Sequence, residues 1–373
     1  MSQELKSGYT TGTCAAVATF SALDILINEV RNKEVKIKSL NGVELDVKVE
    51  RVEKKNNWAR AVVLKYSGDD PDVTNGIEIC AKVKILDELP EIKKALYFDN
   101  IMIVGGRGVG IVTKKGLQVE PGKSAINPGP QKMILQGVKA VLGERDLKVM
   151  VTIYIPKGRE KSLRTFNPRL GIKGGISVLG STGIVKPMSE EALKDSLFVE
   201  LKVLKENTQR DWVIFAFGNH GKAFCEKMGI DTQQMVVISN YIGFMIESAE
   251  KLGFKRILLI GHIGKAIKIA GGIFNTHSKI ADARMEILAA NAVLCNEPRE
   301  NILKVLKSNT VEEACEYIEN KELFKDIANK VSRKCMEYSH EEIKFESALF
   351  TFSGEMIGES KEFYKMAGDL IEK

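Results

Sequence analysis

The fold is decided by the stretch WVIFAFGNHGKAFCEKMG (residues 212–229) and by two later segments that repeat its pattern, MVVISNYIGFMIESAEKLG (235–253) and RILLIGHIGKAIKIAGG (256–272). In each of the three, a short apolar strand runs directly into a helical segment. Continuous apolar strands that alternate with helices favour parallel pairing through right-handed βαβ connections. This region therefore predicts a Rossmann-like parallel-sheet domain. A short apolar strand at GISVLG (175–180) is expected to begin this domain. A late strand at IKFESALFTF (343–352) belongs to it, but the partner of that strand cannot be read from the sequence.

Small polar residues and two histidines stand where these strands end. In an open parallel sheet, ligands bind in the crevice outside the carboxyl ends of the strands. A histidine at that place suits an acid or base role, because its side chain titrates near neutral pH. The alternative is that small polar residues simply end strands and begin helices. The candidates at these ends are Gly218, Asn219, His220, Asn240, Gly261, His262 and Lys265, with His277 in the turn that follows.

Residues 1–156 have a different pattern. Segments such as EVKIKSL, WARAVVLKYS and GIEICAKVKIL alternate apolar and polar residues, as half-buried antiparallel strands do. Two helical runs accompany them, at 13–28 and within SAINPGPQKMILQGVKAVL. The sequence therefore predicts an α/β protein with an N-terminal two-layer α+β domain over 1–156 and a Rossmann-like α/β domain with C-terminal helices over 157–373.

Composition narrows the class of protein. The 373 residues are 44% hydrophobic and 28% charged, which is typical of a soluble globular chain. No apolar run approaches the roughly 20 residues of a membrane span, and no secretory signal pattern is seen. We therefore expect a cytoplasmic protein without a membrane partner. The net charge of +6 is diffuse and the aromatic residues do not interleave with basic ones, so no nucleic acid partner is expected.

The segment GYTTGTCAA (8–16) crowds three threonines in front of the first helical run. Thr13 is expected to cap that helix. Thr10 and Thr11 stand just upstream, beside a helix N-terminus whose partial positive charge attracts anions. The segment is therefore either a simple cap or a cradle for an anion.

The segment GDDPDVTNG (68–76) places three aspartates, Asp70 among them, around a proline. Asp-Pro and Asn-Gly are turn formers, and the calcium-loop pattern does not fit. Besides a turn, the carboxylates could face a cation such as a sulfonium or an ammonium. Asp70 is the candidate catalytic residue in this loop.

Two further segments are candidates for binding anions. GGRGVGIVTKKG (105–116) is followed by no helix, so its glycines predict a bulge or a close backbone approach, with Arg107 as an anion contact. KGREKSLRTFNPRLGIK (157–173) carries six cations, Arg169 among them, against a single glutamate. Such a run is usually a solvated surface, but arginine pairs bidentately with carboxylates.

The motifs together resemble the CbiD family, which acts in the anaerobic cobalamin pathway. The resemblance runs in order from about residue 8 to residue 288. The segments that carry it are GYTTGTCAA, GDDPDVTNG, GGRGVGIVTKKGL, SAINPGPQKMI, NPRLGIKGGISVLGSTGIVKPMS and GHIGKAIKIAGGIFNTHSKIADARMEIL.

The resemblance implies an enzyme that methylates cobalt-precorrin-5B at C1 to give cobalt-precorrin-6A. It implies S-adenosylmethionine as the methyl donor, with cobalt present only as part of the tetrapyrrole substrate and with no metal bound by the protein itself. A homodimer is one assembly compatible with it. In this scheme His262 and Asp70 are the catalytic candidates, and Gly218, Asn219, His220, Asn240 and Gly261 are the donor-binding ones. The candidates for binding the substrate are Thr10, Thr11, Thr13, Arg107, Arg169, Lys265 and His277.

Two other functions stay open at this point. The first is a carrier or chaperone that binds the same tetrapyrrole without chemistry. The second is a metal-dependent hydrolase that would use His277, Asp282 and Glu286, where the two carboxylates stand four residues apart on one helical face.

Overall fold

The computed structural model describes residues 5–371, and the chain divides into two compact units, unit 1 (Met1–Glu191) and unit 2 (Ala192–Lys373). Both units combine helices with sheets, so the α/β class predicted from the sequence is confirmed. The boundary between the units lies 35 residues later than the expected division after residue 156, because the intervening segment pairs with strands of unit 1.

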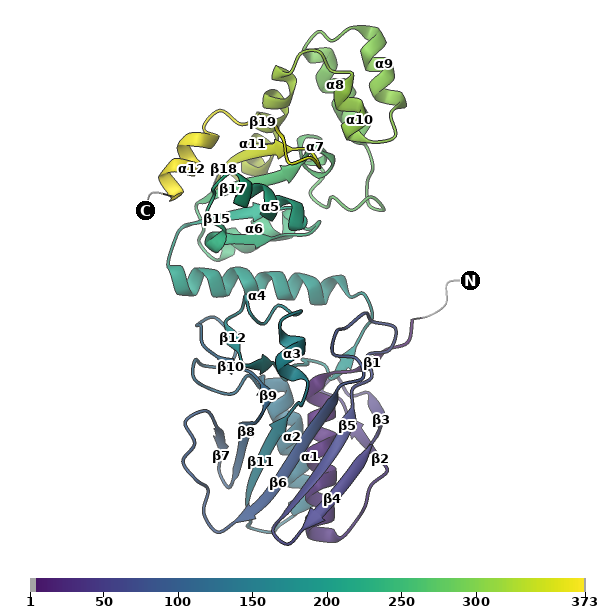
Figure 1. Ribbon diagram of the computed structural model, residues 1–373, viewed down its shortest axis with the longest axis vertical. Helices are drawn as coiled ribbons and strands as arrows, with labels where there is room; N and C mark the ends of the chain where they lie inside the picture. The colour runs from purple at the N-terminus through teal and green to yellow at the C-terminus, as the bar shows by residue number, and fades with distance from the viewer. Residues whose placement is uncertain (1–4, 372–373) are drawn as a thin grey trace. The chain divides into compact units, whose positions relative to one another are not determined.

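Unit 1 is built on a six-stranded sheet (Figure 1). Its strand order is β4 (Arg51–Lys55), β5 (Trp58–Leu64), β6 (Glu78–Leu86), β11 (Lys148–Tyr154), β8 (Ile101–Gly105) and β7 (Leu96–Phe98). Only β11 and β8 are parallel, and the other neighbours are antiparallel. Alternate strand residues are apolar and form a core with α1 (Thr11–Asn28) and α2 (Pro128–Leu142), which cover one face of the sheet.

Helix α1 is the centre of that core. By length and composition it could cross a membrane, with 18 residues and a mean hydropathy of 1.3, so an apolar run of near-membrane length is present after all. Within unit 1, 83% of it is buried, against α2, β5 and β6. Small side chains such as Ala15, Ala18 and Ala22 are fully buried there. The apolar composition of α1 is thus accounted for by its place in the core.

Short strand pairs tie the segment 157–191 to unit 1. The pairs are β1 (Gly8–Tyr9) with β14 (Ile184–Val185), β9 (Gly108–Val109) with β13 (Gly175–Ile176), and β10 (Ile111–Val112) with β12 (Ile172–Lys173). A fourth pair, β2 (Glu34–Lys38) with β3 (Glu44–Lys48), lies earlier in the chain, and α3 (Gly158–Ser162) follows β11. The strand predicted at GISVLG therefore belongs to unit 1, as β13, and not to the second domain.

Unit 2 contains a five-stranded sheet (Figure 1). Its order is β16 (Met235–Val237), β15 (Trp212–Ala216), β17 (Arg256–His262), β18 (Lys344–Phe350) and β19 (Met356–Glu359). The first three pairs are parallel, as the strand–helix repeat predicts, and β19 is antiparallel. The late strand, whose partner could not be read from the sequence, is β18, and it pairs with β17.

Helices cover both faces of this sheet. The side chains of Phe215 and Leu259 pack into one core with α4 (Glu190–Thr208), α6 (Ile242–Lys251), α7 (Ile263–Ala270) and α11 (Glu322–Tyr338). Their neighbours Ile214 and Leu258 face the other core, with α5 (Gly218–Lys227) and α12 (Phe363–Ile371). The remaining helices are α8 (Arg284–Leu294), α9 (Arg299–Lys307), α10 (Val311–Glu316) and the short 3-10 helix η1 (Thr232–Gln234).

Candidate functional site

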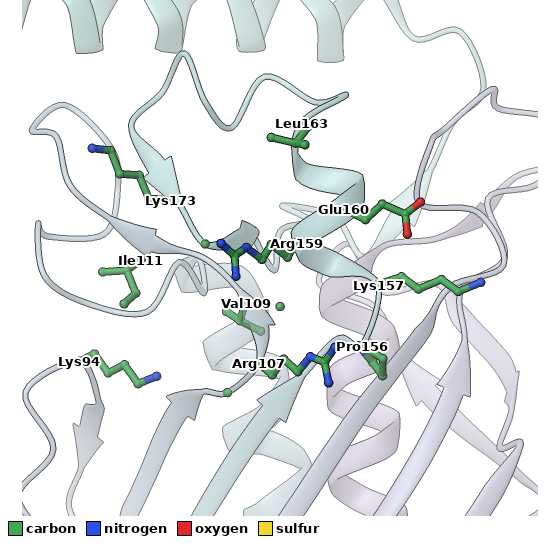
Figure 2. Close-up of a pocket in the computed structure, with 13 residues that line it drawn as sticks. Lys94, Arg107, Val109, Ile111, Pro156, Lys157, Arg159, Glu160, Leu163 and Lys173 are labelled. Atoms are coloured by element: carbon green, nitrogen blue, oxygen red, sulfur yellow. The ribbon is translucent and has the colours of Figure 1, made fainter.

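Unit 1 contains a cavity of about 1090 Å³, which we call the basic cavity (Figure 2). Its walls come from the segment between β8 and β10, from the residues that follow β11, from α3 and from β12. The lining residues are Lys94, Gly106, Arg107, Gly108, Val109, Ile111, Pro156, Lys157, Arg159, Glu160, Leu163, Lys173 and Gly174.

Glycines allow three backbone segments to meet beside this cavity. Gly108 has a φ of 81°, and a Cβ there would lie 1.8 Å from the carbonyl oxygen of Ile155. A Cβ on Gly158 or on Gly175 would lie 2.1 Å or 2.2 Å from the carbonyl oxygen of Gly108. No side chain fits at such distances, so the close backbone approach predicted for the glycine run is confirmed.

The charge of the basic cavity is strongly one-sided. Five cations line it against one carboxylate, Glu160. Within residues 5–371, none of the five forms an ion pair. Arg159 and Glu160 leave α3 in opposite directions in Figure 2. Cations gathered around a concave surface focus a positive potential that attracts anions. The five are Lys94, Arg107, Lys157, Arg159 and Lys173.

The sequence anticipated this cavity only in part. Arg107 lines it, and so do three cations of the basic segment 157–173. Arg169 of that segment does not line it, and its guanidinium lies 5.7 Å from the ring centre of Phe166. Lys94 carries no sequence signal. It is brought to the cavity by the loop before β7, where its carbonyl oxygen accepts a hydrogen bond from the Ser124 N–H at 2.9 Å.

The three threonines lie at the start of α1. The helix begins at Thr11 and its N-cap is Thr10, whose hydroxyl accepts from the Thr13 N–H at 3.2 Å. The expectation that Thr13 is the cap is wrong, because the helix begins earlier. The Thr13 hydroxyl donates to the Gly183 carbonyl at 2.6 Å, and the Thr11 hydroxyl accepts from the Leu179 N–H at 2.9 Å. All three threonines are buried, and protein groups fill the place predicted for an anion.

The aspartate loop forms a hydrogen-bonded turn. The Asp70 carboxylate accepts from the Met188 N–H at 3.0 Å. Asp72 accepts from the buried ammonium of Lys65 at 2.5 Å and from the Thr74 hydroxyl at 2.6 Å. Burial acts to raise the pKa of Asp72, but Lys65 and Thr74 outweigh it, so the pKa lies below its ordinary value. The turn interpretation accounts for the bonds in this loop.

In unit 2, the carboxyl ends of the strands bring together two of the predicted histidines. Phe352, just after β18, stacks on His262 with ring centres 3.8 Å apart. The same phenylalanine meets His220, at the start of α5, edge-on at 5.5 Å. Phe352 is 62% exposed. Phe352 has no signal in the sequence, because it follows a strand that is remote from His220 and His262 in the chain.

Both ring nitrogens of His262 have protein partners. Nδ1 accepts from the Gly264 N–H at 3.1 Å and so caps α7, which assigns the ring proton to Nε2. Nε2 lies 3.1 Å from the Glu312 carboxylate. Burial lowers the pKa of His262, and Glu312 opposes that effect only in part. The imidazole is therefore held neutral, and a proton role for it requires Nε2 to leave Glu312.

The other predicted residues of unit 2 lie around loops and helix starts. Asn240 accepts from the Thr276 hydroxyl at 3.2 Å, which joins the loop after β16 to the loop before α8. His277 is in the second loop, where its Nδ1 accepts from a backbone N–H at 3.1 Å. The Lys265 ammonium lies 5.7 Å from the ring centre of Phe217. These residues are not gathered into one site.

The two predicted glycines differ in their surroundings. Gly261 is buried, and a Cβ there would lie 2.8 Å from the Cβ of Ala266, so it serves the packing of α7 on β17. Gly218 has a φ of 66° and open space where a Cβ would be, and Asn219 beside it is exposed. Of the two glycines, only Gly218, at the start of α5, therefore leaves open space beside it.

The side chains proposed for a metal-dependent hydrolase, those of His277, Asp282 and Glu286, do not form a metal site in the structure. Asp282 receives two hydrogen bonds from the Arg284 guanidinium, at 2.6 Å and 2.9 Å. In the described part of the chain, no group of three or more His, Cys, Asp or Glu side chains is placed to hold a metal ion.

A second cavity, of about 320 Å³, lies in unit 2. We call it the aromatic pocket, because four of its eight lining residues are aromatic. None of the eight was a candidate from the sequence, since they come from four separate segments of the chain. The lining residues are Lys194, Tyr241, Gly243, Phe244, Glu247, Phe274, Asn275 and Tyr338.

Family models match most of the chain. Residues 1–187 match the model described as CbiD, and residues 275–361 match the model described as CbiD, C-terminal domain. A solved structure titled cobalamin biosynthesis protein (cbiD) from Archaeoglobus fulgidus is 28% identical, with a TM-score of 0.39, and the match covers 75% of this chain and 84% of that one.

Curated relatives match over nearly their whole length. A protein of Fusobacterium nucleatum is 57% identical over 98% of both chains. A protein of Thermoanaerobacter is 43% identical over 96% of both. A protein of Methanocaldococcus jannaschii is 44% identical over 95% of this chain and 96% of its own. Each of the three bears the name cobalt-precorrin-5B C(1)-methyltransferase.

Proposed function

The chain belongs to the CbiD family, and from that premise we propose that it is a cobalt-precorrin-5B C(1)-methyltransferase of cobalamin biosynthesis. The product is cobalt-precorrin-6A. The support is the near full-length match to curated relatives of that name, together with the basic cavity of unit 1.

The basic cavity is the structural observation that carries the proposal. The substrate is a tetrapyrrole with several acetate and propionate carboxylates, so it is both large and polyanionic. A volume of about 1090 Å³ is suited to a ligand of that size. Arg107 and Arg159 supply guanidinium groups that pair bidentately with carboxylates, and lysines add point charges around them. We propose that these cations hold the rim of the macrocycle.

We propose S-adenosylmethionine as the methyl donor. When bound, it supplies an electrophilic methyl group: the S–CH₃ bond breaks with its electron pair left on sulfur, and macrocycle C1 provides the pair for the new bond. A sulfonium cation is suited to aromatic rings and to a carboxylate. The aromatic pocket of unit 2 contains both kinds of group, so the residues present fit such a donor.

The protein's contribution to this reaction is alignment and exclusion of water, which reduces the barrier by up to roughly 7–11 kcal/mol in well-oriented systems. No covalent nucleophile is needed. Cys14, in the first motif, is fully buried, and its burial raises its pKa to about 12, so it stays a packed thiol. His262 and Asp70 stay proposals as catalytic groups, and each is now held by a protein partner.

We propose a Rossmann-like arrangement for unit 2, supported by its three consecutive parallel pairs with helices on both faces. We also propose a cytoplasmic homodimer that needs neither membrane nor nucleic acid. Analytical ultracentrifugation of the purified chain tests the assembly.

One experiment tests the function. The protein is incubated anaerobically with methyl-labelled S-adenosylmethionine and cobalt-precorrin-5B, and the product is examined for label at C1. Transfer of one methyl group to C1 is expected. Tight binding of the tetrapyrrole without transfer would indicate a carrier instead, and metal-stimulated hydrolysis without binding would contradict both.

A further inference from the structure

The aromatic pocket of unit 2 is built to surround a cation with rings. The Lys194 ammonium lies 5.0 Å from the ring centre of Tyr241 and 6.0 Å from that of Phe244. Phe274 and Tyr338 also line the pocket, and their rings pack against each other with centres 4.0 Å apart. Distances of up to about 6 Å between a cation and a ring centre give an attractive cation–π interaction. The pocket therefore already accommodates one positive charge.

Opposite charges line this pocket without neutralising each other. The Glu247 carboxylate accepts a hydrogen bond from the Tyr338 hydroxyl at 2.8 Å. Within residues 5–371, neither Glu247 nor Lys194 takes part in an ion pair. A pocket with one available carboxylate and one available ammonium is complementary to a ligand that carries both signs of charge.

The backbone keeps this arrangement open. Gly243, at the start of α6, donates its N–H to the Phe274 carbonyl at 3.0 Å. A Cβ at Gly243 would lie 2.8 Å from the Tyr338 hydroxyl oxygen and 3.1 Å from the Cβ of Phe274. A glycine at this position thus allows α6, the loop before α8 and the end of α11 to meet around the pocket.

The volume of the aromatic pocket decides whether the methyl donor or the tetrapyrrole substrate fits in it. The volume of about 320 Å³ is at the lower end of the roughly 300–1,000 Å³ found for small-molecule pockets. It is less than a third of the basic cavity, so it suits a nucleoside-sized molecule and not a tetrapyrrole.

We propose that the aromatic pocket is the binding site of the sulfonium nucleoside S-adenosylmethionine, an inference that rests on the proposed function. The rings of Phe244 and Phe274 contact the adenine and the sulfonium. The Glu247 carboxylate faces the sulfonium charge, and Lys194 binds the carboxylate of the ligand. The predicted donor contacts at the start of α5, Asn219 and His220, are then not the main site.

The test is calorimetric titration of the full chain with S-adenosylmethionine, which is a cation at sulfur, and with S-adenosylhomocysteine, which is neutral there. Glu247→Gln is compared with Glu250→Gln, an exposed glutamate on the same helix outside the pocket. Lys194→Met is compared with Lys251→Met, whose ammonium also lies near a ring, 5.8 Å from Phe198, but outside the pocket.

Glu247→Gln and Lys194→Met should each weaken binding of S-adenosylmethionine about tenfold. The loss in Glu247→Gln should be smaller for S-adenosylhomocysteine, because the sulfonium charge is absent from it. The two control variants should bind as the wild type does. Both glutamate variants change only exposed side chains, so folding is preserved.

The failures of the two proposals are distinguishable. If the wild type transfers the methyl group while Glu247→Gln and Lys194→Met keep the wild-type affinity or KM for S-adenosylmethionine, the pocket assignment is overturned and the methyltransferase stands. Loss of affinity in Asn219→Ala alone would likewise move the site to the start of α5. If the wild type neither binds the donor nor transfers label, the proposed function falls, and the pocket assignment falls with it.

Discussion

Arg159 belongs to α3 and lines the basic cavity, where it has no carboxylate partner among the described residues. Arg159→Gln keeps a polar side chain but removes one charge-assisted pair with the substrate. We expect KM for the tetrapyrrole to rise about tenfold, because hydrogen bonds to charged groups contribute roughly 1.5–3 kcal/mol. The rise is measured by steady-state kinetics, and it should shrink as salt is added.

The matched control for this change is Arg164→Gln. Arg164 is exposed and comes from the same basic segment, but it does not line the cavity. An equal effect of both substitutions would mean that the segment acts through its overall charge and not through the cavity.

Thr11 shows how a residue's role changes once its partners are known. The sequence suggests that Thr11→Val weakens ligand binding, but in the structure the hydroxyl exchanges hydrogen bonds with both backbone groups of Leu179. Thr11→Val should therefore cost about 0.5–1.5 kcal/mol of unfolding free energy, because the part-buried Leu179 N–H loses its hydrogen-bond acceptor. Urea denaturation measures this loss. Thr182→Val, at an exposed site in the nearby loop, should change stability by less than about 0.5 kcal/mol.

His262 should make the stability of unit 2 depend on pH. Burial lowers its pKa in the folded state, while in the unfolded chain the pKa is the ordinary value of about 6.5. The unfolded state therefore binds more protons, and stability is lost as the pH falls through about 6.5. Between about pH 7.5 and about pH 5.5, the wild type should lose more unfolding free energy than His262→Gln. His340→Gln, at an exposed turn, serves as the control, and an unchanged pH slope in His262→Gln would contradict the assignment.

At the scale of elements, the contact of β9 with β13 and α3 depends on Gly108. Gly108→Ala would place a Cβ 1.8 Å from the Ile155 carbonyl oxygen, at a φ of 81°. The backbone would have to move, at a cost of about 3 kcal/mol or more. Gly122→Ala is the control, because its φ is 89° but nothing lies within 4 Å, so that only about 1–2 kcal/mol of backbone strain is expected. Equal losses in urea unfolding would show that backbone strain, and not packing, explains the glycine.

Elements were predicted best where the pattern is local. The strands at 212, 235 and 256 follow from continuous apolar runs bounded by helical segments, and their parallel pairing follows from the connections. GISVLG was assigned to the wrong domain because its partner, β9, lies far upstream and no periodicity reports it. The start of α1 was misjudged by two residues because several adjacent threonines can cap.

The candidate site residues, too, could be predicted only where the signal is local in the sequence. Arg107 could be proposed from the sequence because glycines surround it, and the basic segment stood out by its charge. Lys94 and Tyr338 could not be, since each reaches its cavity only through tertiary packing. The hydrogen bonds from Thr11 to Leu179, from Thr13 to Gly183 and from His262 to Glu312 also join distant segments, so a local pattern cannot reveal them.

For the whole molecule, the position of the unit boundary makes a direct prediction. A fragment of residues 1–191 keeps β12, β13 and β14 with their partners, whereas a fragment of residues 1–156 loses all three. The longer fragment should unfold in a single cooperative urea transition, and the shorter one should not. Circular dichroism during urea titration measures both. Cooperative unfolding of the shorter fragment would place the boundary at 156 after all.

The closure of α1 by the loop around Leu179 also has a consequence for synthesis. The N-terminus of α1 is completed by hydrogen bonds to groups 168 and 170 residues further along the chain. While the ribosome is translating the segment between α1 and Leu179, the N-terminus of this 18-residue apolar helix lacks its hydrogen-bond partners. At roughly 5–20 residues per second, this interval lasts on the order of ten seconds or longer. We therefore expect α1 of nascent unit 1 to be accessible to a ribosome-bound chaperone until residue 183 has emerged.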